Sequence, residues 1–161
     1  MSWHSAMLAT HIGSGILAIL AGTAAVAARK GGVFHARAGT WFFAAMLVLG
    51  TSAAALEPFR RPQPGSPVVG IFVCYFVLTS WVTARRRDGR TGRFEACAGT
   101  VAVAVAAAMF AGGLGGAAPA GRNPALFLGA LCLLAGLLDF NAVLRRRLTP
   151  AQRVSRHLWR M

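Results

Sequence analysis

The stretch Lys30-Gly-Gly-Val-Phe-His-Ala-Arg-Ala-Gly-Thr-Trp41 decides how the rest of the chain is interpreted. It is a short polar segment between two long apolar runs, and it carries His35 and Arg37. A run of about 20 apolar residues crosses the ~30 Å hydrocarbon core as a helix, and polar residues stay outside it. The stretch therefore predicts a hinge between two membrane helices, with His35 and Arg37 at the mouth of the second helix.

The composition also indicates a membrane protein. Hydrophobic residues make up 56% of the 161 residues, more than a soluble domain of this size can bury, because its surface is large relative to its volume. The formal net charge is +13, and the charges gather in short clusters beside apolar runs. We therefore expect anionic lipid headgroups, rather than nucleic acid, as the partner of these clusters.

The predicted fold class is all-α: a polytopic transmembrane helical bundle that forms a single domain over residues 1–161. No Lys or Arg precedes the first apolar run, whereas a signal peptide needs a basic start, so we expect this run to be retained as a span. The expected spans are residues 6–28, 38–56, 67–84, 96–114 and 124–144.

The distribution of Lys and Arg predicts the orientation, because cytoplasmic loops carry the excess of these residues. All except Arg60, Arg61 and Arg122 lie in the first loop, the third loop or the tail. We expect a multi-pass protein of the bacterial inner membrane, with the N-terminus outside and the C-terminus in the cytoplasm.

The tail, residues 150–161, is predicted to be helical. Thr149 is a good N-cap and Pro150 suits the first helical position. The tail has two interpretations: the first turns of a truncated sixth span, or a basic amphipathic helix on the inner leaflet.

The fourth run carries small residues at every fourth position. Such a stripe allows two helices to approach closely, so we expect it to be a packing face within the bundle. Its members are Ala104, Ala108, Gly112 and Gly116.

Ionisable groups at membrane depth are costly, so each is a candidate functional residue. Five of them are predicted to share one depth near the cytoplasmic face, where Arg37 or Arg160 could pair with the carboxylate of Asp139. The set fits an ion-pair network joining spans two and five to the tail, or a site for a proton, a quinone headgroup or a metal, or simple snorkelling at helix ends. This polar cluster is His35, Arg37, Asp139, His157 and Arg160.

Ligation of haem b by histidines needs two imidazoles at similar depth on facing helices. Only His35 with His157 passes this test, so these two are the candidate haem or metal ligands. His11 lies near the opposite face, and we interpret it as an intramembrane packing residue hydrogen-bonded to a neighbouring hydroxyl or backbone group.

Motifs of soluble enzymes are missing from the sequence, including a phosphate-binding loop, H-E-x-x-H and G-x-S-x-G. We therefore expect a non-enzymatic protein, either transporter-like or an accessory membrane subunit, with a membrane-protein partner or a homo-oligomeric state. The alternatives are a redox protein that binds b-type haem or quinone, and a purely structural bundle.

Several motifs together resemble a family of uncharacterised prokaryotic membrane proteins, domain of unknown function 2306. They are the Lys30-Gly31…His35-x-Arg37-x-Gly39 hinge, Tyr75-x-x-Leu-Thr-x-Trp81, Asp139 and the closing His157-Leu-Trp-Arg-Met161. The resemblance implies a multi-span helical bundle with no established activity. In that family the closing motif typically opens a further apolar helix, which favours the truncated-span interpretation of the tail.

Overall fold

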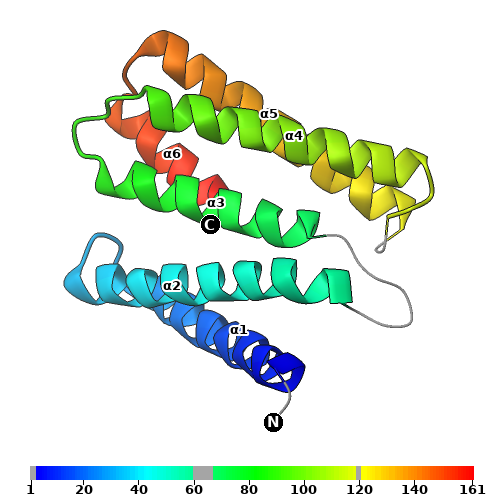
Figure 1. Cartoon of the computed structure of the whole chain (residues 1–161). Coiled ribbons are helices and arrows are strands. Elements are labelled where there is room, and N and C mark those ends of the chain that lie inside the picture. Colours follow the sequence, from blue (N-terminus) through cyan, green and yellow to red (C-terminus); the bar gives the residue numbers. More distant parts are fainter. Residues whose placement is uncertain (1–2, 60–66, 119–120) are drawn as a thin grey trace. The chain divides into compact units, whose positions relative to one another are not determined.

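The structure is a computed structural model that describes residues 3–59, 67–118 and 121–161. Within these ranges it is all-α and contains no strand. The elements, shown in Figure 1, are α1 (Trp3–Ala27), α2 (Val33–Leu56), the 3₁₀ turn η1 (Glu57–Phe59), α3 (Val68–Arg85), α4 (Arg93–Leu114), α5 (Arg122–Arg145) and α6 (Pro150–Arg160).

Five helices, α1 to α5, are long and apolar enough to cross a membrane. They coincide with the five predicted spans, so the chain is a multi-pass helical membrane protein. α6 follows them as an amphipathic helix of 11 residues. Its start at Pro150 confirms the helix predicted for the tail.

Helices extend beyond the apolar runs at several ends. α2 begins at Val33 rather than near residue 38, so His35 and Arg37 lie in its first two turns and not in a loop. The physical reason is that apolarity reports only membrane depth, whereas a helix needs only backbone hydrogen bonds, which polar residues make equally well. The turn between α1 and α2 is correspondingly short, and Gly31 supplies its positive φ of 80°.

The chain forms two compact units, Met1–Cys74 and Tyr75–Met161. In the first unit α1 packs along α2, and Gly50 on α2 faces the beginning of α3. A Cβ atom added at Gly50 would lie 2.7 Å from Cys74 Sγ and 3.0 Å from the carbonyl oxygen of Gly70. Glycine at this position therefore allows the two backbones to approach closely.

In the second unit α4 and α5 lie side by side (Figure 1). Their contact is formed by small residues: Gly99 and Ala102 on α4 meet Gly136 on α5. A Cβ atom at Gly136 would lie 3.1 Å from Ala102 Cβ and 3.1 Å from the Gly99 carbonyl oxygen. Without a hydrophobic effect between helices in lipid, such close packing is what holds them together.

The prediction that the small-residue stripe of span four forms a packing face was wrong. Ala104 and Ala108 are exposed, and the buried residues of α4 are instead Gly99, Ala102, Val105, Ala106, Met109 and Gly113, with Glu95 at its start. A row spaced strictly by four drifts about 40° around the helix at each step, because a turn contains 3.6 residues. Alternating steps of three and four residues stay on one side, and that is the spacing of the buried face.

A short polar connection fixes where α6 begins. Leu148 N donates to Gly89 O at 2.8 Å, and Thr91 N donates to Arg146 O at 3.1 Å, so the α3–α4 loop runs against the α5–α6 loop. Gly89 has a φ of 66° and lies directly against the Leu148 carbonyl. These bonds hold the first residue of α6 beside the end of α3.

A capping box then starts α6. Thr149 Oγ1 accepts from Gln152 N at 3.3 Å, and Gln152 Oε1 accepts from Thr149 N at 3.0 Å. This arrangement satisfies two backbone donors that a helix start otherwise leaves unpaired. It confirms the N-cap predicted at Thr149.

Candidate functional site: a buried carboxylate held by two arginines

Asp139 is completely buried on α5. Its Oδ2 accepts from the Tyr75 hydroxyl at 2.5 Å, and its Oδ1 accepts from Arg160 Nη2 at 2.7 Å and from Arg156 Nη2. Burying a carboxylate costs several kcal/mol unless it is paired and hydrogen-bonded. These donors provide that compensation, and we call the four residues Tyr75, Asp139, Arg156 and Arg160 the Asp139 cluster.

The cluster connects three helices of the second unit. Tyr75 comes from α3, Asp139 from α5 and both arginines from α6. Arg156 and Arg160 are four residues apart, so they project from the same face of α6 and reach the same carboxylate. α6 is therefore attached through long side chains to a buried group on a membrane helix.

Arg160 is the better enclosed of the two arginines. Its side chain is fully buried and also donates from Nη2 to Ala135 O at 3.1 Å. Its guanidinium carbon lies 5.6 Å from the Tyr75 ring centroid and 5.0 Å from that of Trp159. Cation–π attraction of this kind is worth about 0.5–2 kcal/mol, with the larger value in desolvated sites.

The charges of the cluster do not cancel. Two guanidinium groups surround one carboxylate, which leaves one positive charge in excess. Burial lowers the pKa of Arg156, and the neighbouring Arg160 lowers it further, but a guanidinium remains protonated in proteins. In addition, Nε of Arg156 and Nε of Arg160 are buried without a hydrogen-bond partner among the described residues.

Three of the five residues predicted to form a polar cluster lie in the second unit. Asp139 and Arg160 are in direct contact, which is one of the two pairings that the sequence analysis left open. His157 is on the same helix as Arg160, but its Nδ1 hydrogen-bonds to Ser80 Oγ of α3 at 2.9 Å. It therefore helps to attach α6 to α3.

His35 and Arg37 belong to the first unit. His35 Nδ1 lies 2.9 Å from the Ala25 carbonyl oxygen, and because a carbonyl only accepts, Nδ1 is the donor. Arg37 is exposed on α2. Their contact with the Asp139 cluster, and the pairing of His35 with His157 about a haem, remain predictions.

His11 lies in the first unit, where Nδ1 is 2.9 Å from Ser52 Oγ of α2. Ser52 is buried and its hydroxyl also donates to Leu49 O at 3.0 Å, so the imidazole Nδ1 donates to the serine oxygen. This is the hydrogen bond to a neighbouring hydroxyl expected for a packing histidine.

Sequence reasoning missed Tyr75 and Arg156 as members of the site. Tyr75 did carry a signal: it is the only tyrosine in the chain, and it lies within a span rather than at the interface where tyrosine is usually enriched. Arg156 carried one too, since its spacing of four from Arg160 places both on one helical face. Counting Arg156 only toward the membrane charge bias hid this pairing.

A second buried acid, Glu95, has its charge balanced locally. Its Oε1 is 3.0 Å from Arg86 Nη1, and its Oε2 accepts from the backbone of Gly92 at 2.7 Å at the start of α4. Glu95 is thus fully engaged in an ion pair and a helix cap. Its carboxylate also raises the pKa of Arg156, so it offsets part, but not all, of the excess charge of the Asp139 cluster.

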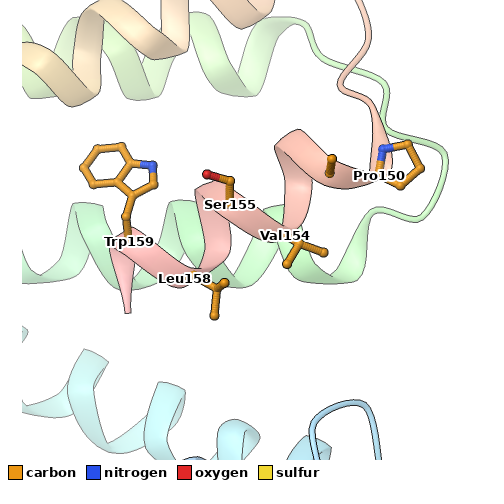
Figure 2. A pocket seen from close by; sticks show the side chains of 6 residues that line it. Pro150, Val154, Ser155, Leu158 and Trp159 are labelled. Atoms are coloured by element: carbon orange, nitrogen blue, oxygen red, sulfur yellow. The ribbon is translucent and has the colours of Figure 1, made fainter.

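Two hollows involve α6. One is an open depression on its outer side, where Figure 2 shows Val154 and Leu158 projecting away from Ser155 and Trp159. The other is a pocket of about 290 Å³ between α5 and α6, partly lined by Arg156 and Arg160. Only the second touches the Asp139 cluster, so it is the hollow that bears on function.

Metal-ligating groups are not concentrated anywhere in the described ranges: no set of three His, Cys, Asp or Glu residues could hold an ion there. The cysteines Cys74, Cys97 and Cys132 are all free thiols. A haem would depend on imidazoles, and His35 is suited to one because its Nδ1–H is fixed by a carbonyl, which leaves Nε2 as the lone-pair nitrogen of the neutral ring.

Comparisons with models of known protein families, with curated proteins and with solved structures gave no significant match to this chain. The resemblance to domain of unknown function 2306 therefore stays a prediction based on the quoted motifs.

Proposed function

We propose that this chain is a non-enzymatic protein of the bacterial inner membrane, transporter-like or an accessory subunit of a membrane assembly. The observation that carries the proposal is the fully buried Asp139, held by two arginines and a tyrosine. Ionisable groups at membrane depth mark ion or substrate pathways, because their cost must be compensated by function or by close pairing.

The composition of the cluster favours a working site over a purely structural ion pair. A structural lock is satisfied by equal and opposite charges, and replacing such a pair by apolar residues is often neutral or stabilising. Here one carboxylate faces two guanidiniums, and two of their N–H groups lack acceptors. Such an arrangement can change partners when a proton, a solute or a partner helix arrives.

The test uses the purified protein in liposomes on a solid-supported electrode. Jumps of pH and of small organic and inorganic anions are expected to produce currents that disappear in Asp139→Asn and persist in Asp88→Asn. Asp88 is an exposed carboxylate, so the control makes the same chemical change outside the cluster. If wild type gives no current, the accessory form of the proposal requires a membrane protein that co-purifies with it.

Loss of that partner in Asp139→Asn, with retention in Asp88→Asn, would support the accessory form. Absence of both current and partner in wild type would contradict the proposal. A current or partner that survives Asp139→Asn unchanged would show that the cluster is structural only.

The proposed orientation places the N-terminus outside and α6 in the cytoplasm, since positive residues flank spans on the cytoplasmic side. A reporter that is active only in the cytoplasm should be active when fused after Arg147. Activity of a periplasm-only reporter at the same position would reverse the topology.

A redox function is the second candidate, and the hydrogen bond from His35 Nδ1 to Ala25 O favours it. A b-type haem would supply one-electron chemistry, with His35 as a ligand; a quinone headgroup is the related alternative. Protein expressed with added haem should show a Soret band that shifts on reduction and is lost in His35→Ala. A colourless preparation without bound quinone would exclude this candidate.

A further inference from the structure

The pocket between α5 and α6 has an unusual chemical balance. Its lining includes three arginines and no carboxylate: Arg145, Arg156 and Arg160. Asn141, Gln152 and Ser155 add neutral polar groups, and Leu138, Leu148 and Trp159 add apolar surface. We call this hollow the α5–α6 pocket.

The acids near the pocket neutralise its positive charge only in part, although Glu95 also acts on Arg156. Asp139 offsets one of the two arginines of its cluster, and Glu95 is paired with Arg86. Arg145 contributes a further positive charge, and its Nε donates to the Asn141 amide oxygen at 3.1 Å, which keeps the guanidinium at the pocket. The pocket is therefore a concave site of net positive charge in which hydrogen-bond donors are in excess.

Buried donors without acceptors provide a second, independent observation. Nε of Arg160 and Nε of Arg156 have no partner in the part of the chain that the structure describes, although the Arg160 side chain is fully buried and that of Arg156 is 8% exposed. Unsatisfied buried N–H groups cost about 1–3 kcal/mol each and are rare in native proteins. These unpaired groups show that the two guanidiniums are incompletely compensated, and an anion bound at their accessible edge would compensate their charge.

We propose that the α5–α6 pocket binds a phosphate-bearing anion. Guanidinium groups match the geometry of phosphate oxygens, which accept several charge-assisted hydrogen bonds at once. The pocket lies along the last two turns of α5, where an apolar span ends at Arg145, and phospholipid phosphates lie at that depth of a membrane. Basic pockets between membrane helices bind anionic lipid headgroups in the same way.

The mixed lining fits an amphiphilic anion. Phosphate oxygens would contact the arginines and Ser155, and the leucines and Trp159 would contact the hydrocarbon that a lipid carries. A free phosphate would use the first group of contacts only. The inference goes beyond the proposed function, since the pocket would bind the anion whether the protein is a transporter or an accessory subunit.

The experiment measures binding to the delipidated protein in neutral detergent by native mass spectrometry and by thermal unfolding. The probes are phosphatidylglycerol, zwitterionic phosphatidylcholine and inorganic phosphate. We expect saturable binding of phosphatidylglycerol and not of phosphatidylcholine. Binding of inorganic phosphate as well would show that the phosphate group alone is recognised, whereas its failure would assign the site to the lipid.

Two variants test the location without altering the Asp139 cluster. Arg145→Gln removes one charge from the lining, and Ser155→Leu fills the pocket; each should weaken phosphatidylglycerol binding about tenfold, as expected for one charge-assisted contact. Arg122→Gln is the matched control, because it removes an exposed arginine from the other end of α5. Equal affinity for the two lipids, or equal losses in all three variants, would overturn the proposal.

Discussion

The charge imbalance of the Asp139 cluster makes an ordered prediction for three substitutions. Asp139→Asn keeps the shape of the side chain but leaves Arg156 and Arg160 buried without a counter-ion. Removing one partner of a buried ion pair costs about 3–5 kcal/mol, because the remaining charge is uncompensated. We expect this variant to be the most disruptive of the three.

The arginine variants should be less damaging, and unequally so. Arg160→Met leaves Asp139 paired with Arg156 but loses the bond to the Ala135 carbonyl and the contact with the Tyr75 ring, so about 2–3 kcal/mol is expected. Arg156→Met removes the surplus charge together with one unpartnered Nε. The stability gained by removing the surplus charge and the unpaired N–H group offsets the lost hydrogen bond. The net loss of stability should therefore be about 1 kcal/mol or less.

Hydrogen exchange of the α6 backbone amides measures this directly, because these side chains, together with the His157–Ser80 hydrogen bond, attach α6 to the rest of its unit. A loss of 3 kcal/mol corresponds to a rise in exchange of about 100-fold, since each 1.4 kcal/mol is a factor of ten. Exchange should therefore increase most in Asp139→Asn, less in Arg160→Met and least in Arg156→Met. Asp88→Asn serves as the control and should leave α6 unchanged.

The reasoning would be refuted by a different order. If Arg156→Met were as damaging as Asp139→Asn, the two guanidiniums would not be in surplus over the carboxylate. If Asp139→Asn left α6 exchange unchanged, the carboxylate would not hold the helix at all.

Three further predictions concern the α4–α5 contact, the loop at Gly89 and the cap of α6. Gly136→Leu should separate α4 from α5 and cost about 3 kcal/mol or more in an SDS-unfolding titration, whereas Ala104→Leu on the exposed side should cost less than about 0.5 kcal/mol. Gly89→Ala places a Cβ atom 2.5 Å from the Leu148 carbonyl oxygen at a positive φ, so proteolysis of the α5–α6 loop should become faster than in Gly92→Ala. Thr149→Ala removes the α6 cap, and exchange of the first α6 amides should rise by about fivefold, matching roughly 1 kcal/mol; Thr149→Ser should not change it.

Much of the fold could be predicted because the bilayer simplifies the problem. Apolar length alone identifies a span, and the five runs in the sequence became the five helices. The tail helix was also predictable, since capping is a local interaction between Thr149 and Gln152. The ends of the helices were less predictable. α2 extends to Val33 because a helix continues through polar residues as readily as through apolar ones.

The residues of the Asp139 cluster could be predicted only in part, and the reason differs from that for the helix ends. That Asp139 needed a cationic partner follows from the cost of a buried charge, and Arg160 was among the partners expected. The choice of Arg156 and Tyr75 depended on which faces of α3, α5 and α6 meet. Helix packing decides that, and residues far apart in sequence carry no local record of it.

What the sequence by itself determined is thus the set of membrane helices, the helix at the tail and the need to compensate Asp139, because each follows from local hydrogen bonding or from transfer into hydrocarbon. Only the tertiary structure decided that Gly99 and Gly136, rather than the four-residue stripe, form the α4–α5 contact, and that two arginines share one carboxylate. Both depend on helix rotation, which is set by packing between helices rather than by the properties of any one of them.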